Sequence, residues 1–195
     1  MKLQGTVTIG GAKNATLALM PAALLVSGTF RFANTPDLRD VATMSSLLTS
    51  MGMEIELKDH VLRLDTTRVN KQEAPYEFVK KMRASIYVLG PLVARFGHAR
   101  VSLPGGCAWS PRPVNLHIDG IRKLGAEVEL ADGYINAKAP KLTGAKINFE
   151  NTKPVAYRAR TGFWHLAASA ARGGRIISIK AEVLPQACVR REEFP

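Results

Sequence analysis

The segment Gly52-Met53-Glu54-Ile55-Glu56-Leu57 returns about 70 residues later as Gly125-Ala126-Glu127-Val128-Glu129-Leu130. In both copies a glycine that can end a helix precedes a run in which apolar and charged side chains alternate. A short polar turn with an aspartate, Asp59 or Asp132, follows each run, and a second alternating run comes next. The pattern therefore predicts a β-hairpin, preceded by a helix, that occurs twice in the chain.

The repeat extends upstream of both hairpins, where Lys13 aligns with Arg83 and Pro21 with Pro91. Each copy predicts a buried helix, a strand, an amphipathic helix and a hairpin. The two prolines lie inside the buried helices, so they should kink or locally unwind them. The expected ranges are 15–25, 29–32, 41–51 and 54–57 with 61–64 in the first copy, and 84–96, 100–103, 114–124 and 127–130 with 134–137 in the second.

One such unit cannot bury its own apolar face, so we expect neighbouring copies to pack together in an α/β fold. We interpret residues 1–152 as two units, about 5–68 and 76–140, with residues 70–75 as the joint between them. From residue 153 the pattern weakens and arginines become frequent. Residues 153–195 are expected to be an atypical basic tail, either the start of a third unit or a frame-shifted end.

The composition is typical of a globular protein and does not suggest a membrane-spanning or disulfide-rich one. The chain has 195 residues, of which 46% are hydrophobic and 22% charged, as in globular proteins. No apolar run is long enough to cross a bilayer, and the first residues do not form a signal peptide. Two cysteines make no disulfide framework, so we expect a cytoplasmic protein.

The net charge of +11 points to anionic partners, either nucleic acid or small phosphorylated molecules. The basic residues are scattered and aromatic residues are few, which disfavours nucleic acid. The spacings of zinc ligands, P-loops and dinucleotide-binding loops are all missing from the sequence. We therefore expect no metal and no cofactor.

The loop from Pro104 to Pro113 carries the clearest chemical signal. Gly105 and Gly106 allow close approach of a ligand, and Cys107 follows them. Arg112 lies just before the N-terminus of the next predicted helix. A thiol and a guanidinium beside a helix N-terminus indicate chemistry on a phosphate or carboxylate. The thiol could be a nucleophile, a proton donor or inert, and the alternative for the whole segment is an ordinary surface loop.

Lys13 follows two glycines and an alanine and precedes a helix, which is the arrangement of an anion site. The repeat places Arg83 at the equivalent helix start. Together with Arg112, these cations are predicted to converge on one phosphate, and the alternative is that each is a solvated surface charge. His117, one turn into the helix after the loop, is equally compatible with a functional and a structural role.

Several runs closely resemble the UDP-N-acetylglucosamine 1-carboxyvinyltransferases, a family of enolpyruvyl transferases. The resemblance covers about residues 2–152. It implies an inside-out α/β barrel in two domains, each built from three copies of one unit, so the barrel would be incomplete here. The runs are Gly10-Gly11-Ala12-Lys13-Asn14, Met82-Arg83-Ala84-Ser85, Gly90-Pro91-Leu92-Val93-Ala94-Arg95-Phe96-Gly97, Leu103-Pro104-Gly105-Gly106-Cys107 and Arg112-Pro113-Val114-Asn115-Leu116-His117.

The resemblance implies transfer of enolpyruvate from phosphoenolpyruvate to the sugar 3-hydroxyl, the first committed step of peptidoglycan synthesis. Cys107 would be the general acid and the thiol that fosfomycin alkylates. Lys13, Asn14 and Arg112 would bind phosphoenolpyruvate. The UDP-sugar would contact Asn14, Arg83, Arg112, Pro113, Val114, Asn115 and Leu116. The family also implies a monomer, with no membrane or nucleic-acid partner.

The sequence departs from the family pattern at Tyr87, which usually is Trp, and at Asn115, which usually is Asp. After residue 152 the recognised motifs end, and the family's aspartate base and further arginines are not found, so the chain alone is expected to be inactive. Two alternatives stay open. One is a 3-phosphoshikimate 1-carboxyvinyltransferase, disfavoured because that family usually has Ser at the position of Asn14. The other is a non-catalytic basic domain that binds phosphate or nucleic acid.

Overall fold

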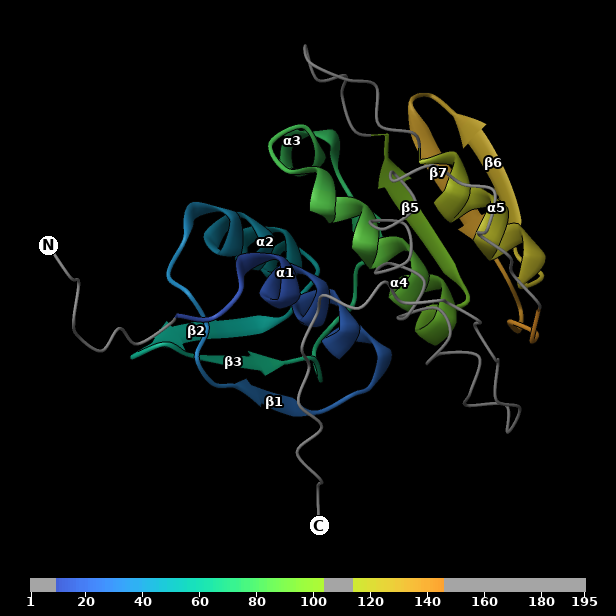
Figure 1. The fold of residues 1–195 in the computed structure, drawn as a ribbon. Coiled ribbons are helices and arrows are strands. Elements are labelled where there is room, and N and C mark those ends of the chain that lie inside the picture. Colours follow the sequence, from blue (N-terminus) through green and yellow to red (C-terminus); the bar gives the residue numbers. More distant parts are fainter. Residues whose placement is uncertain (1–9, 104–113, 146–195) are drawn as a thin grey trace, which may run out of the picture.

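The computed structural model describes residues 10–103 and 114–145. Its helices and strands form two successive groups (Figure 1). The first group consists of α1 (Lys13–Ala22), the 3₁₀ helix η1 (Ala23–Leu25), β1 (Thr29–Phe32), α2 (Arg39–Ser50), β2 (Glu54–Lys58) and β3 (Val61–Asp65). The second consists of β4 (Glu73–Ala74), α3 (Tyr76–Val79), the 3₁₀ helix η2 (Arg83–Val88), α4 (Leu89–Phe96), β5 (His98–Ser102), α5 (Asn115–Lys123), β6 (Glu127–Ala131) and β7 (Tyr134–Lys138).

Each group contains the predicted hairpin. The first sheet has the strand order β1-β3-β2, and the second has the order β4-β5-β7-β6. The connection between β2 and β3 is a two-residue turn in which Asp59 and His60 have φ values of 50° and 60°. Asp132 and Gly133 take the same left-handed conformation between β6 and β7. Two successive positive φ values define the turn type that matches the twist of antiparallel strands, so the hairpin prediction is confirmed.

The two groups repeat each other at the level of single hydrogen bonds. The amide of Thr66 donates to the carbonyl of Gly28 at 3.0 Å, and Ala139 donates to Gly97 at 2.8 Å in the same place of the second group. Gly52 and Gly125, with φ values of 100° and 92°, follow α2 and α5 in equivalent positions. L-residues rarely adopt this conformation, which explains why both turns carry glycine.

Both predicted buried helices are divided at their prolines. Pro21 lies in the last turn of α1, which passes into the 3₁₀ helix η1. Pro91 lies in the first turn of α4, which follows the 3₁₀ helix η2. Proline has no N–H to donate to the preceding turn, so the expected local unwinding is confirmed.

The segment 70–75 is more than a joint, which corrects the sequence interpretation. Glu73 and Ala74 form β4, which pairs in parallel with β5. The Arg100 guanidinium lies 3.2 Å from the Glu73 carboxylate, and Ala74 is completely buried. The first part of the second group is therefore anchored at the edge of its own sheet by pairing over a long sequence separation.

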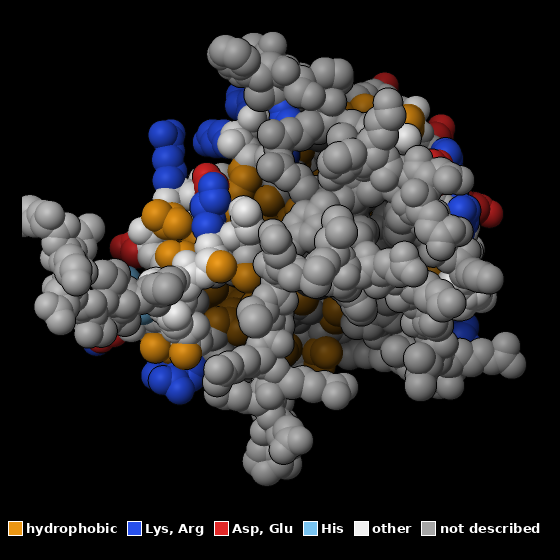
Figure 2. Space-filling model, viewed as in Figure 1, with side chains coloured by type: hydrophobic (Ala, Val, Ile, Leu, Met, Phe, Trp, Pro, Cys, Tyr) orange, Lys and Arg blue, Asp and Glu red, His pale blue; other side chains and the backbone are white. Residues whose placement is uncertain are grey.

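Helices cover one face of each sheet, and one apolar core runs through both groups. Leu62 and Leu64 point from β3 into this core, while Arg63 between them is exposed, as strand alternation requires. Apolar side chains also reach the surface of the molecule (Figure 2). Leu19 and Val26, for example, are 48% and 44% exposed. The described residues form two adjacent α/β units and no closed barrel.

None of the helices in residues 10–103 and 114–145 has the length and apolar composition needed to cross a membrane. The predicted boundary at residue 152 and the tail 153–195 lie outside the described residues.

Candidate anion site at the start of α1

Lys13 is the first residue of α1 and follows Ala12, whose backbone is extended. Its ammonium Nζ donates a hydrogen bond to the Asp40 carboxylate at 2.6 Å. Asp40 lies in the first turn of α2, so the ion pair joins the starting ends of two packed helices. The two side chains are 45% and 41% exposed, which leaves this pair open to a ligand from solvent.

A close backbone contact holds these two helix starts together. A β-carbon on Gly11 would lie 1.6 Å from the main-chain oxygen of Asn34 and 3.2 Å from the ring of Pro36. Only glycine leaves room for this approach. Asn34 itself has a φ of 54°, a left-handed conformation that asparagine tolerates better than most residues. The glycines before Lys13 thus allow two loops to touch and bring Asp40 toward Lys13.

Arg83 occupies the matching position in the second group. It is the first residue of η2 and follows Met82, which is extended like Ala12. Its side chain is half-buried, and η2 packs against α1. The predicted equivalence of Lys13 and Arg83 as helix-start residues is therefore confirmed. Their convergence with Arg112 on one phosphate stays a prediction.

The neighbouring site candidates differ in exposure. Asn14 is exposed in the first turn of α1. Val114 precedes α5 and is half-buried, Asn115 is exposed as its first residue, and Leu116 is half-buried. The assigned roles of these residues are not tested by the fold. Cys107, Arg112, Pro113 and Cys188 lie outside the described residues.

His117 in α5 lies near Tyr87 in η2. The two ring centroids lie 6.2 Å apart and the planes are tilted by 52°. Burial lowers the pKa of His117 to about 4, because the charged imidazolium would lose its hydration there. The imidazole is therefore neutral near pH 7 and cannot offer a positive charge to a phosphate.

The sequence analysis missed Asp40 and Ser85. The sequence around Asp40 does not indicate a role in a binding site, because acidic residues are common in the first turn of a helix, where they interact favourably with the helix dipole. Only the fold shows that it pairs with a lysine 27 positions earlier. The Ser85 hydroxyl is fully buried two residues after Arg83 and has no hydrogen-bond partner within the described part of the chain.

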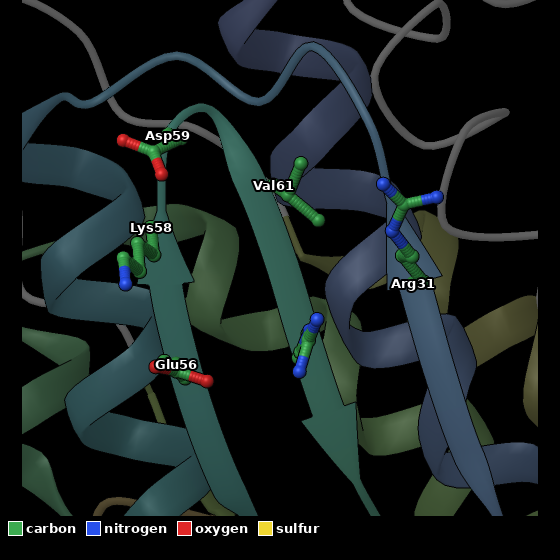
Figure 3. A pocket seen from close by; sticks show the side chains of 6 residues that line it. Arg31, Glu56, Lys58, Asp59 and Val61 are labelled. Carbon is green, nitrogen blue, oxygen red and sulfur yellow. The ribbon is translucent and has the colours of Figure 1, made fainter.

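A separate hollow of about 300 Å³ lies on the outer face of the first sheet (Figure 3). Arg31, Glu56, Lys58, Asp59, Val61 and Arg63 line it. The apolar neighbours of these residues along each strand point to the opposite face, into the core, so the hollow is distinct from the site at Lys13. Within residues 10–103 and 114–145, no three His, Cys, Asp or Glu side chains gather in a way that could hold a metal ion.

Known proteins resemble the chain in both sequence and fold. The family model described as EPSP synthase (3-phosphoshikimate 1-carboxyvinyltransferase) matches residues 1–184. A UDP-N-acetylglucosamine 1-carboxyvinyltransferase of Desulfosudis oleivorans is 53% identical over 149 residues, which are 76% of this chain and 36% of the relative. A protein of the same name from Thermodesulfovibrio yellowstonii is 50% identical over 182 residues, which are 93% of this chain and 42% of that relative.

A solved structure shows the same fold. The enolpyruvyl transferase NikO from Streptomyces tendae superposes with a TM-score of 0.71 at 24% identity, covering 85% of this chain and 39% of NikO. The family match and the longer alignment both extend past residue 152, where the recognised motifs end. The chain spans about two fifths of the length of the relatives it matches over most of its own length.

Proposed function

The chain belongs to the EPSP synthase family of carboxyvinyl transferases, and we propose that it is the N-terminal portion of a UDP-N-acetylglucosamine 1-carboxyvinyltransferase. The reaction moves enolpyruvate from phosphoenolpyruvate to the 3-hydroxyl of UDP-N-acetylglucosamine and releases phosphate. Its partners are these two small molecules. We place it in the cytoplasm, at the first committed step of peptidoglycan synthesis.

The names of similar relatives support UDP-N-acetylglucosamine as the acceptor of the enolpyruvyl group. Relatives that are 46–53% identical to this chain bear the name UDP-N-acetylglucosamine 1-carboxyvinyltransferase. The similarity extends over most of the chain, and the run Gly10–Asn14, in which Asn14 follows Lys13, is one of the runs that resemble this family. The chain covers about two fifths of these relatives, so the complete reaction is assigned to the longer protein that they represent.

The geometry at the start of α1 suits an anionic substrate. Lys13 offers three N–H donors, of which Asp40 accepts one, so two remain for a phosphate or carboxylate. The helix start adds main-chain N–H groups and the positive end of the helix dipole. We assign Lys13 and Arg112 to the phosphate and carboxylate of phosphoenolpyruvate, and Asn14 to contacts with both substrates.

The remaining roles follow the family resemblance. Cys107 acts as the general acid that protonates the methylene carbon of phosphoenolpyruvate, while the sugar 3-hydroxyl gives its proton to the family's aspartate base and its oxygen attacks the adjacent carbon. The tetrahedral intermediate then loses phosphate and one proton of the new methyl group, which restores the carbon–carbon double bond. Arg83 and residues 112–116 bind the UDP-sugar. The protein contributes positioning and electrostatic stabilisation, together with one proton transfer.

The family model also admits a second acceptor, because its description names 3-phosphoshikimate 1-carboxyvinyltransferase. Binding of UDP-N-acetylglucosamine and of shikimate 3-phosphate to the 195-residue chain, measured by calorimetry, distinguishes the two. We expect tighter binding of the UDP-sugar. Tighter binding of shikimate 3-phosphate would support the second acceptor, and binding of DNA that falls steeply with salt, without UDP-sugar binding, would support a non-catalytic basic domain.

A further inference from the structure

The ion pair between Lys13 and Asp40 connects the proposed anion ligand to a residue with no assigned role. The carboxylate of Asp40 lies 2.6 Å from the ammonium of Lys13. The two residues belong to different helices, whose starting ends are held together by the backbone contact between Gly11 and Asn34. The pairing is thus imposed by the fold and not by neighbourhood in the sequence.

We propose that Asp40 is a positioning residue, which holds the ammonium of Lys13 in the orientation that receives the substrate's phosphate or carboxylate. This inference rests on the proposed function, in which Lys13 binds phosphoenolpyruvate. Asp40 itself need not touch the substrate, because it acts through Lys13.

Lysine needs such a partner more than arginine does. Its ammonium sits on a flexible four-carbon stem, and ordering that stem on ligand binding costs conformational entropy. A carboxylate that already fixes the stem removes part of this cost before the substrate arrives. Because the ammonium has three donors, Asp40 can occupy one without blocking the ligand.

If Asp40 acted through its charge alone, it would weaken the binding of an anion at Lys13. A carboxylate near the site repels an incoming anion, so removing it should tighten binding if Asp40 were only a counter-ion. The sign of the change in affinity therefore separates a positioning role from a purely electrostatic one.

The experiment measures anion binding at Lys13 directly in the 195-residue chain. Limiting acetylation of lysines, read by peptide mass spectrometry, is carried out at increasing concentrations of phosphoenolpyruvate. Lys58 and Lys123, both exposed, serve as internal references in every sample. We expect phosphoenolpyruvate to protect Lys13, and Asp40→Asn to raise the concentration needed for half-protection about three- to fivefold.

Asp37→Asn is the matched control, since it removes the same charge from an exposed position in the loop that leads to α2. It should leave half-protection unchanged, and Asp40→Glu, which keeps the carboxylate, should restore part of the effect. A merely structural role of Asp40 would not give this graded rescue at Lys13. Asp40→Ser replaces Asp40→Asn if circular dichroism shows that the latter does not fold.

Two failures can be told apart. If Lys13 is protected in all variants and Asp40→Asn needs the same or less phosphoenolpyruvate, the positioning role of Asp40 is wrong and the proposed function stands. If phosphoenolpyruvate does not protect Lys13 in the unsubstituted chain, the assignment of Lys13 itself is wrong, and the role of Asp40 is overturned with it.

Discussion

The guanidinium of Arg95 donates a hydrogen bond to the main-chain carbonyl of Leu24 at 3.1 Å, across 71 positions of sequence. The same side chain also donates to Val26 at 3.3 Å and to Thr66 at 3.2 Å. Arg95 lies on α4 in the second unit, whereas its three acceptors belong to the first unit. Leu24 and Val26 lie at the end of η1, and Thr66 directly follows β3. One side chain thereby satisfies three main-chain carbonyl groups and joins the two repeated units.

Replacing Arg95 by Met should lower the free energy of unfolding by about 2 kcal/mol, because hydrogen bonds from a charged donor contribute more than neutral ones. Urea denaturation followed by circular dichroism measures the change. Arg63→Met is the matched control, since Arg63 is exposed on the outer face of the first sheet and should alter stability by less than about 0.5 kcal/mol. Equal effects of the two substitutions would show that Arg95 does not join the units.

Gly11→Ala should displace the loop that contains Asn34, because the new methyl group would lie 1.6 Å from the Asn34 oxygen. We expect a loss of about 2 kcal/mol in the free energy of unfolding, the size of other forced overpacking. Acetylation of Lys13 should also become faster, because Asp40 moves away with the loop.

The neighbouring glycine provides the control for this substitution. No heavy atom of the described residues lies within 4 Å of the position that a β-carbon on Gly10 would take. Gly10→Ala should therefore leave both stability and the acetylation rate of Lys13 unchanged. A Gly11→Ala protein as stable as Gly10→Ala would contradict the close approach of the two loops.

His117 should make the protein less stable as the pH falls from about 6.5 to about 4. Its pKa is lowered to about 4 in the folded chain by burial, whereas an unfolded histidine titrates near 6.5. In this interval the unfolded chain binds a proton that the folded chain does not, so stability rises with pH and levels off above about 6.5. The full effect is roughly 3 kcal/mol.

Thermal or urea unfolding between pH 4 and pH 7 measures this dependence. His117→Gln should flatten it, whereas His98→Gln, a change at an exposed strand residue, should preserve it. An unchanged slope in the His117→Gln protein would show that another group titrates in this interval.

Cys107 should react with iodoacetamide at neutral pH faster than Cys188, a prediction that comes from sequence alone. The cations Lys13, Arg83 and Arg112 are expected to stabilise its thiolate and so lower its pKa from about 8.5. The charges next to Cys188 are mixed, with Arg190 and Arg191 beside Glu192 and Glu193. Mass spectrometry of the labelled peptides gives both rates, and phosphate ions should slow the labelling of Cys107. Faster labelling of Cys188 would remove the argument for an activated thiol.

The elements themselves were predictable because their causes are local. Alternation of apolar and charged residues predicted the hairpins to within one or two residues, and the Asp59 and Asp132 turns have the conformation that such short connections need. Gly52 and Gly125 marked the ends of α2 and α5. The alignment of Lys13 with Arg83 also predicted that the two residues occupy equivalent positions where a helix starts, and they are the first residues of α1 and η2.

The pairing of distant groups was decided only by the tertiary structure. Nothing within a few residues of Asp40 indicates Lys13 as its partner, and nothing near Glu73 indicates a parallel strand against β5. Arg95 likewise finds its acceptors in the other unit. A local pattern reports the backbone conformation that a segment prefers, whereas these contacts depend on which surfaces the packed core brings together. Local patterns in the sequence therefore predict the repeated unit and the residue types of the candidate site, whereas packing of the core brings together the charges that meet there.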